Sequence, residues 1–304
     1  MPAGSDRRPM VSCGLCFAAS LLAISIATPA IAQDAAPDSV PSRSSDVPSG
    51  IDPGGDRISI GVGLSSTPSY IGSDRSVIMP TAAVQGQVAG IGFNSSGTAL
   101  YVDAVPGNGK PGWKVQAGPL LTVRLDRHGR INDADVSSLG KRRVAIEPGA
   151  SLGIQRTGVV TSPYDTLSFG LSYQHDVANA HRSYVMSPEI DYDTPLSTHM
   201  LVGLSLSADY VGRRFGDYYY DIDDAGSAAS GLPAYAAANR GGWKDWNLGM
   251  MTAHSLTGTL THGLGLFVTG GYQRIMGPYR RSPVVSLAGD ANQWSGAVGV
   301  EFTF

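Results

Sequence analysis

The chain has 304 residues, with 39 glycines, 15% charged residues and a formal net charge of −3. This weak acidity argues against a nucleic-acid partner, because such a partner selects a basic surface. Charge is sparse, yet after the N-terminal region no apolar run approaches the roughly 18 residues of a transmembrane helix. A β-barrel reconciles the two observations, because only every second residue of each strand must be apolar.

The N-terminal region has the pattern of a secretory signal peptide. Arg7 and Arg8 precede an apolar run from Val11 to Ala27, and Ala30-Ile31-Ala32 follows as a small-residue cleavage motif. We expect residues 1–32 to direct export through the Sec pathway and to be cleaved from the mature protein.

Two other export signals match less well. A lipoprotein needs a cysteine at the end of the apolar run, but Cys13 and Cys16 lie at its beginning, and Pro9 interrupts the twin-arginine pattern. Cleavage removes both cysteines, which are the only two in the chain. The exported protein therefore has no disulfide, no cysteine-ligated metal and no cysteine nucleophile.

Residues 33–56 are rich in Pro, Ser, Asp and Gly and have no apolar period, which predicts a disordered N-terminal arm. From Arg57 onward apolar and polar residues alternate, as they do in strands with one apolar and one polar face. The stretch RISIGVGLS, for example, places Ile58, Ile60 and Val62 on one face and Ser and Gly on the other. The alternation predicts about twelve strands, centred on 57–65, 76–86, 87–94, 98–104, 112–125, 142–155, 165–176, 182–193, 198–211, 242–256, 259–275 and 292–304.

The connections between the later strands alternate in length. The segments DTPLST and SLTGTL are short, whereas 126–141, 212–241 and 276–291 are long. An up-and-down outer-membrane barrel has short periplasmic turns, long outer loops and both termini on the periplasmic side. We therefore predict an all-β, antiparallel up-and-down transmembrane barrel over residues 57–304, placed in the outer membrane of a Gram-negative cell.

A soluble sandwich or lipocalin-like barrel is the main alternative fold. Its exposed face would be rich in Lys and Glu, whereas the polar strand face here consists mostly of Gly, Ser, Thr, Ala and Gln. Aromatic residues also gather near the predicted strand ends, where a membrane barrel carries its interfacial girdles. These residues are Trp113, Tyr173, Tyr184, Tyr192, Tyr210, Trp243, Trp246, Tyr272 and Trp294.

Charged residues on the polar strand face are expected to project into the lumen and to pair there. On the lipid face each of them would cost roughly 2–4 kcal/mol at mid-membrane. They are Lys114, Arg124, Arg143, Glu147 and Glu301.

The last predicted strand, QWSGAVGVEFTF, alternates strictly and places Phe302 and Phe304 on its apolar face. We expect this face to meet lipid. The alternation also resembles the signal by which the barrel-assembly machinery recognises its clients, so Phe302 and Phe304 are predicted to act as an assembly signal.

No residues form a recognisable catalytic, cofactor or metal site. His254-Ser255 and His175-Asp176 suggest Ser/His hydrolysis, but neighbouring strand residues point to opposite faces and cannot easily serve one site. The six histidines are scattered without ligand spacing. We expect a protein that is not an enzyme.

The most distinctive polar segment is DYYYDIDDAGS, which contains Asp217, Tyr218, Asp221, Asp223 and Asp224. One interpretation is an outer loop that binds divalent cations, cationic ligands or sugars. The alternative is a solvated loop folded into the barrel mouth, with its tyrosines anchored at the headgroup level. A basic counterpart, Arg280-Arg281 together with Arg213-Arg214, is a candidate to pair with these acids or with lipopolysaccharide phosphates.

Several stretches together resemble the MipA/OmpV family of Gram-negative outer-membrane proteins, named for the MltA-interacting protein. In order, they are SYIGSD at 69–74, HDVANAHRSYVMSPEIDYDTPLS at 175–197, DYYYDIDDAGSAASGLPAY at 217–235, GGYQRIMGPYRRSPVVS at 270–286 and the strand that ends at Phe304. The sequence departs from the family at Arg281, before Ser282-Pro283, where an acidic residue is more usual. The loop is therefore more basic here than is usual in the family.

The resemblance implies an outer-membrane barrel that acts as a scaffold for a lytic murein transglycosylase and a murein synthase at the cell wall. Other family members are treated as adhesins, osmotic-response proteins or porin-like proteins. The resemblance transfers no catalytic residues. A small porin for polar solutes and a surface adhesin therefore stay open beside the scaffold, with outer-membrane lipid and lipopolysaccharide as further expected partners.

Overall fold

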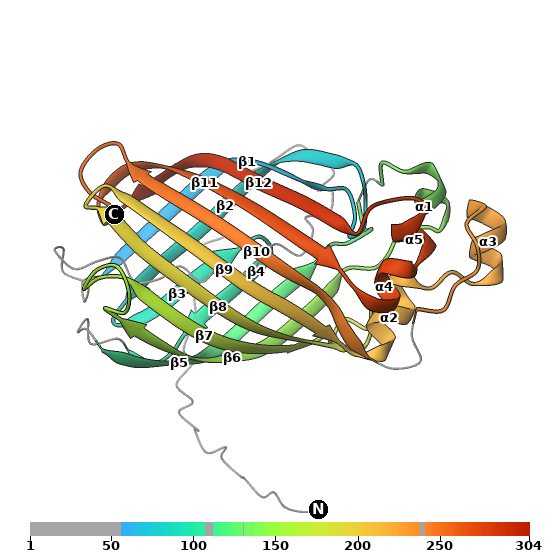
Figure 1. Cartoon of the computed structure of the whole chain (residues 1–304), viewed down its shortest axis with the longest axis horizontal. Coiled ribbons are helices and arrows are strands. Elements are labelled where there is room, and N and C mark those ends of the chain that lie inside the picture. The colour runs from blue at the N-terminus through green and yellow to red at the C-terminus, as the bar shows by residue number, and fades with distance from the viewer. Residues whose placement is uncertain (1–55, 107–111, 130, 238–240) are drawn as a thin grey trace, which may run out of the picture. The chain divides into compact units, whose positions relative to one another are not determined.

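The computed structural model describes residues 56–106, 112–129, 131–237 and 241–304. The predicted signal peptide, and the predicted arm apart from Asp56, lie outside the described residues. Twelve strands form one closed antiparallel barrel in which each strand pairs with its neighbours in the chain and β1 pairs with β12 (Figure 1). This confirms the predicted fold class.

The strands are β1 (Arg57–Pro68), β2 (Ser76–Val88), β3 (Ile91–Ser96), β4 (Ala99–Asp103), β5 (Trp113–Arg124), β6 (Ala145–Thr157), β7 (Thr166–His175), β8 (Tyr184–Ser197), β9 (Met200–Val211), β10 (Gly242–Ser255), β11 (Gly263–Ile275) and β12 (Asn292–Thr303). Short helices occupy three of the connections: α1 (Ala134–Ser138), α2 (Arg213–Tyr220), α3 (Asp224–Ser230), α4 (Gly277–Arg281) and α5 (Pro283–Ser286).

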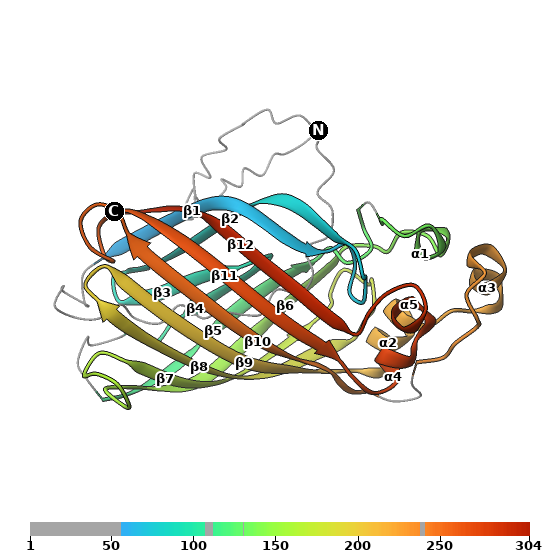
Figure 2. The ribbon, with the colours of Figure 1, turned by 45° about the horizontal axis from the view of Figure 1, so that its top comes forward.

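All five helices lie at one end of the barrel, hereafter the helical end (Figures 1 and 2). They belong to the three long connections, which join β5 to β6, β9 to β10 and β11 to β12. The opposite end, hereafter the turn end, holds the first residue of β1 and the last residue of β12. The alternation of long and short connections therefore has the predicted arrangement.

The side-chain alternation is inverted relative to a soluble barrel. On β1 the outward residues Ile60, Val62 and Leu64 are 48%, 54% and 56% exposed, whereas the inward Ser59 is 7% exposed. The same pattern recurs on β9, where Leu204 and Leu206 are exposed and Ser205 and Ser207 are buried. An apolar outer wall around a polar interior is the arrangement that lipid requires.

The barrel closes through a ladder between β1 and β12 in which Val62 faces Val300 and Gly63 faces Gly299. Near the turn end, Ser59 Oγ and Thr303 Oγ1 are 2.7 Å apart, and the N–H of Phe304 donates to the carbonyl of Ile58 at 2.9 Å. The two strands approach so closely that a Cβ at Gly299 would lie 2.3 Å from the carbonyl oxygen of Val62.

The sequence places the boundary between the second and third strands too early. The alternation predicts a break after residue 86, but β2 continues to Val88 and the turn is Ala89-Gly90. Both turn residues have positive φ, 51° and 79°, as a two-residue hairpin of the primed type requires. Ala89 is an unusual residue for this conformation, so the sequence carries no clear turn signal there.

We predict that Gly299→Val prevents closure of the barrel, because its side chain would have to displace the β1 backbone. Gly270→Val is the matched control, since a Cβ at Gly270, also on a strand, has no atom within 4 Å. Heat-modifiable migration on a detergent gel reports folding. We expect it to be lost for Gly299→Val and kept for Gly270→Val, and equal behaviour of the two variants would contradict the closure geometry.

Candidate functional site: the helical end of the barrel

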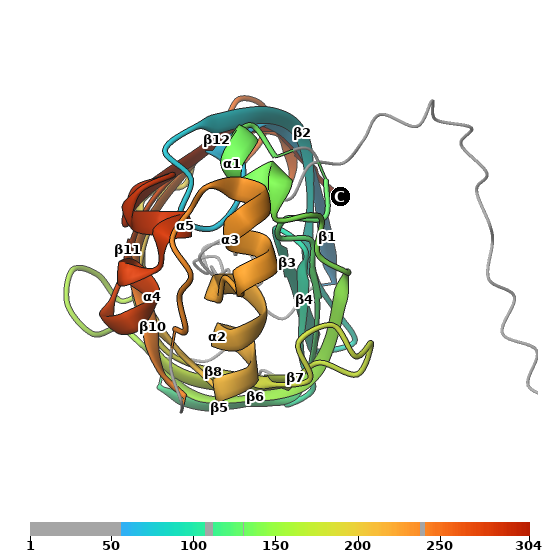
Figure 3. The same cartoon turned by 90° about the vertical axis from the view of Figure 1, so that its right-hand side faces the viewer.

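At the helical end α2 and α3 follow one another across the view, and α4 and α5 lie to one side of them (Figure 3). The sequence of α2, RRFGDYYY, buries Phe215, Gly216, Tyr219 and Tyr220 and leaves Arg213 and Arg214 exposed. These buried positions are spaced at i, i+1, i+4 and i+5, so they share one face of the helix. The helix therefore turns an aromatic face towards the barrel and a charged face away from it.

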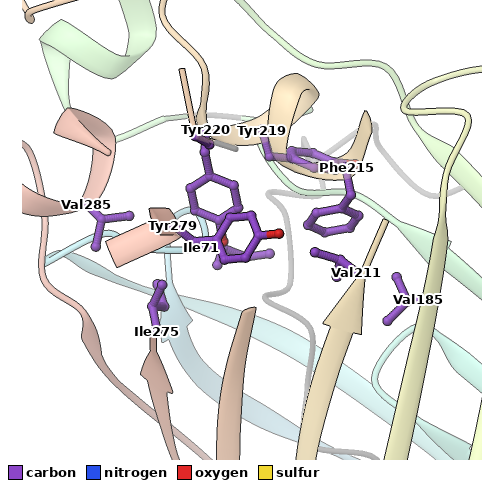
Figure 4. Close-up of a cluster of buried hydrophobic side chains, with 10 residues drawn as sticks. Ile71, Val185, Val211, Phe215, Tyr219, Tyr220, Ile275, Tyr279 and Val285 are labelled. Atoms are coloured by element: carbon purple, nitrogen blue, oxygen red, sulfur yellow. The ribbon is translucent and has the colours of Figure 1, made fainter. Parts of the chain in front are cut away.

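The aromatic face of α2 forms the largest buried apolar cluster, together with side chains from the strand ends and α4 (Figure 4). The ring of Phe215 lies 4.8 Å from that of Tyr219, and Tyr220 lies 5.2 Å from Tyr279 of α4. A Cβ at Gly216 would lie 2.9 Å from Cε1 of Tyr279, so the two helices touch at a residue without a side chain. Offset and tilted ring pairs of this kind stabilise a core beyond their buried area.

A second apolar cluster joins four connections of the helical end, those between β1 and β2, β5 and β6, β9 and β10, and β11 and β12. It contains Tyr70, Val136 of α1, Ile222, Leu232 and Val284 of α5. The hydroxyl of Tyr70 donates to the carbonyl of Ala288 at 2.5 Å, which ties the β1–β2 connection to the β11–β12 connection. The long connections therefore share a packed core.

Below α2, one wall of the barrel carries a buried ion pair with a histidine. Arg124 donates to both oxygens of Glu147, from Nε and Nη2, at 2.9 Å each. Nε2 of His181 lies 2.5 Å from Glu147 Oε1, while His181 Nδ1 accepts the N–H of Ser183 at 3.2 Å. Because Nδ1 is an acceptor, this geometry assigns the neutral tautomer with the proton on Nε2.

The opposite wall carries a second buried charge group. Nζ of Lys244 lies 3.2 Å from Asp209 and 3.1 Å from Asp245, and Gln273 donates to Asp245 at 2.6 Å. Both cationic groups approach the ring of Phe215, with Arg124 at 5.1 Å and Lys244 at 5.4 Å from its centroid. The ring of Phe215 therefore contacts two cations that come from different strands, β5 and β10.

The backbone of α2 is also fixed at its C-terminal end. Arg127 Nη1 donates to the carbonyl of Tyr219 at 3.1 Å, and Ser282 Oγ donates to the carbonyl of Tyr220 at 2.6 Å. Burial and the nearby charge of Arg142 lower the pKa of Arg127 to about 10, so it remains protonated at neutral pH. These bonds satisfy carbonyl groups that the end of a helix leaves without partners.

The acidic, tyrosine-rich segment does not form the single acidic loop that its sequence suggests. Asp217 pairs with Arg213 at 3.4 Å, Asp221 accepts the N–H of Ala237 at 2.5 Å, and Asp223 caps α3 through the N–H of Gly226 at 2.7 Å. Asp224 lies exposed in the first turn of α3, and Tyr218 Oη accepts the N–H of Arg143 at 2.7 Å. Each of the first three carboxylates thus has its own partner in the protein.

The tyrosines of this segment also lie elsewhere than expected. Tyr219 and Tyr220 are 2% and 1% exposed, within the core of the helical end rather than at the membrane surface. Burial raises the pKa of both hydroxyls well above the usual value. The sequence missed this core because eight residues of helix are too few to show a clear period.

The basic candidates Arg280 and Arg281 lie in the last turn of α4, where both are exposed. They do not contact the acidic side chains of α2 and α3 through any salt bridge among the described residues. Their proximity to the helix C-terminus is electrostatically favourable.

The predicted lumen charges are placed correctly in part. Lys114 pairs with Asp103 at 3.0 Å and Arg124 pairs with Glu147, both on the inner face. Arg143 was placed wrongly, because β6 begins only at Ala145 and the Arg143 side chain instead donates to the carbonyl of Ala178 at 3.1 Å. Glu301 is half-buried on the inner face of β12.

At the other end of the molecule, Phe302 and Phe304 are 41% and 64% exposed, and their rings lie 4.8 Å apart. Their assembly role stays a prediction.

His254 is exposed while Ser255 is buried, so these neighbours point to opposite faces of β10. Within the part of the chain that the structure describes, no group of His, Cys, Asp or Glu is arranged to hold a metal ion. The described residues include no helix with the length and apolarity to cross a membrane.

The turn end has one connection with a rigid centre, residues 158–165. The carboxylate of Asp165 accepts the N–H groups of Val159, Val160 and Thr161 at 2.7, 2.7 and 2.6 Å. Burial opposes the charged form, but these bonds hold the pKa of Asp165 well below its usual range. The turn presents Val160, which is 72% exposed.

Comparison with known proteins gives one family and several structures. A family model described as MltA-interacting protein MipA matches residues 60–304. The chain matches none of the curated proteins.

Among solved structures, an outer-membrane channel from Pseudomonas putida F1 has a TM-score of 0.41 at 11% identity, covering 87% of this chain and 100% of that chain. A bacterial polysaccharide outer-membrane secretin has a TM-score of 0.35 at 12% identity, covering 81% and 98%. A Pseudomonas aeruginosa FadL homologue has a TM-score of 0.31 at 9% identity, covering 82% and 89%. At these identities the likeness concerns the barrel alone.

We predict that Lys244→Ala destabilises the folded barrel by about 3–5 kcal/mol, because it leaves Asp209 and Asp245 buried without their cation. Arg214→Ala, at an exposed position, is the control and should change stability by less than about 0.5 kcal/mol. Chemical unfolding of the two variants in lipid vesicles measures the difference. Equal unfolding midpoints would rule out a structural role for the buried charge group.

We predict that Asp165→Asn loosens the 158–165 turn and speeds hydrogen exchange at Val159, Val160 and Thr161. Because the native pKa is depressed, the carboxylate stabilises the turn above its ordinary pKa of about 4, and this stabilisation is lost as the pH falls through the native value. Asp176→Asn, which removes a similar carboxylate in the 176–183 connection, should leave these three amides protected. Unchanged exchange in Asp165→Asn would disprove the role of the carboxylate.

Proposed function

We propose a scaffold function for this chain, which belongs to the family of the MltA-interacting protein MipA. The chain is an outer-membrane β-barrel, so its helical end is taken as the outer end and its turn end as the periplasmic end. In this proposal the periplasmic end binds a lytic murein transglycosylase and a murein synthase, and the barrel holds them at the membrane. Export through the Sec pathway and recognition of Phe302 and Phe304 by the barrel-assembly machinery are part of the same proposal.

The observation that carries the proposal is the filled outer mouth. The side chains of Phe215, Tyr219 and Tyr220 are buried at this end, and the ring of Phe215 contacts both Arg124 and Lys244. A channel for polar solutes needs a continuous wet path, and a packed aromatic core does not supply one. A closed outer mouth favours a function exerted from the periplasmic surface.

The periplasmic end offers surface for such a partner. Three large apolar side chains are well exposed at its turns: Val160 at 72%, Leu196 at 60% and Leu256 at 50%. The turn that carries Val160 is fixed by the bonds to Asp165 described above. A rigid apolar side chain loses little conformational entropy on binding, which favours its use as an anchor in a protein interface.

A small channel remains the second candidate function. It is favoured by the polar inner face, where Ser187, Glu189, Asp191 and Asp193 follow one another along β8. This candidate requires that the α2 segment leave the mouth, because the aromatic core lies across the path.

We predict that the purified barrel, in detergent and with both ends accessible, retains a purified MltA-type transglycosylase. Val160→Asp/Leu256→Asp should weaken this binding by at least about tenfold, since it places charge in an apolar interface. The matched control is Val177→Asp/Leu287→Asp, which alters side chains of the outer end that are 58% and 65% exposed. Binding to the control should equal that of the unmodified chain.

Failure of the unmodified barrel to bind the enzyme would contradict the scaffold function. Equal weakening by both double variants would contradict the assignment of the partner to the periplasmic end. Heat-modifiable migration of every variant checks that folding is intact.

A further inference from the structure

Exposed basic side chains are unevenly distributed around the outer end. Among the described residues they concentrate at the ends of β6 to β11, on one arc of the rim. The members of this basic arc are Lys141, Arg143, Arg182, Arg213, Arg214, Arg280 and Arg281. The remaining arc runs from β12 through β1 and β2 to β5. Among the described residues its exposed arginine is Arg75, which lies 3.9 Å from Asp74 and donates to the carbonyl of Asn132.

The outward aromatic residues of the outer end follow nearly the same arc, on β7 to β12. They form a series of ring contacts rather than isolated side chains. The contacts are Tyr173–Tyr184 at 5.8 Å, Tyr210–Trp243 at 5.4 Å, Trp246–Tyr272 at 5.3 Å and Tyr272–Trp294 at 4.8 Å. The outward residues at the outer ends of β1, β2 and β6 are aliphatic instead, for example Leu64, Ile78 and Ile146.

The backbone that carries the basic arc passes close to the aromatic residues along the rim. A Cβ at Gly212, just before Arg213, would lie 2.9 Å from Cε1 of Tyr184. A Cβ at Gly277, the first residue of the helix that carries Arg280 and Arg281, would lie 3.8 Å from the carbonyl oxygen of Trp243. Aromatic girdles lie at the level of the lipid headgroups, so the arginines just beyond them lie at the level of the headgroup phosphates.

The protein does not neutralise most of this positive charge. Asp217 pairs with Arg213. The carboxylate of Asp176 instead accepts backbone N–H groups of Ala178 and Arg182 at 2.9 Å each. Among the described residues, Arg182, Arg214, Arg280 and Arg281 make no salt bridge to a carboxylate, so their guanidinium groups are available to an external anion.

We propose that the basic arc binds the phosphate groups of a phosphorylated lipid of the outer leaflet, such as lipid A. Guanidinium groups bind phosphate through paired, charge-assisted hydrogen bonds. The acyl chains of the same lipid then lie against the aromatic residues and the apolar wall below them, where Leu206, Leu248 and Met250 are exposed. Because the arc combines positive charge with apolar surface, it fits an amphipathic anion better than a free inorganic anion such as phosphate. This inference does not depend on the scaffold function.

The test compares two double variants that remove the same charge. Arg280→Gln/Arg281→Gln alters the arc, whereas Arg75→Gln/Arg156→Gln is the control. Arg75 lies outside the arc. Arg156 lies at the periplasmic end, 5.4 Å from the ring centroid of Trp113, so this control also removes an arginine that lies beside an outward tryptophan. Binding of purified diphosphorylated lipid A to each folded barrel is measured in detergent micelles, with dephosphorylated lipid A and inorganic phosphate as comparison probes.

We expect affinity for diphosphorylated lipid A to fall on the order of tenfold in the arc variant, because each arginine near an anionic lipid surface adds to the binding free energy and the variant removes two of them. The control variant should bind as the unmodified barrel does, and dephosphorylated lipid A should bind weakly to all three. Equal affinity of the arc and control variants would overturn the proposal. So would equal binding of dephosphorylated lipid A, or inorganic phosphate binding as tightly as the lipid.

Arg214→Gln serves as a second variant should the double substitution reduce folding, because it lies on α2 and does not alter α4. It should lower lipid A affinity severalfold, and an unchanged affinity in this variant would also count against the arc.

Discussion

The structure depends on one constraint, which is that every backbone polar group inside a membrane needs a partner within the protein. The barrel meets this constraint by pairing β1 with β12, where Gly63 faces Gly299 and the chains approach more closely than side chains would permit. Closure determines which side of each strand meets lipid and which side meets the lumen. The apolar outer wall, the polar interior and the placement of the connections at two ends all follow from it.

The polar interior determines in turn how the outer mouth is filled. Because inward residues are polar, the outer ends of β5 and β10 carry Arg124 and Lys244 in buried ion pairs rather than in an apolar core. Both cations contact the ring of Phe215, and these contacts help to fix the short helix α2 at the mouth. A barrel with a filled helical end and structured turns at its other end fits the proposed scaffold function better than the passage of solutes.

Much of the fold was predictable from the sequence, because lipid exposure imposes a period of two on every strand. The run from Trp294 to Phe304 shows this period without interruption, and β12 (Asn292–Thr303) contains all of it except Phe304. The helical end was not predictable in the same way. Tyr219 and Tyr220 look like headgroup anchors in the sequence, but a turn of helix buries them, and the distant Arg127 and Ser282 fix their backbone. Such contacts join residues far apart in the chain, and no local period reports them.

The central claim is that the α2 core closes the outer mouth, and single-channel recording in planar bilayers tests it most directly. The account predicts that the unmodified barrel shows no stable openings, whereas Phe215→Ala/Tyr219→Ala, which removes two contacting rings of the α2 core, shows frequent ones. Stable and reproducible openings of the unmodified barrel, equal in size and frequency to those of the double variant, would contradict the account.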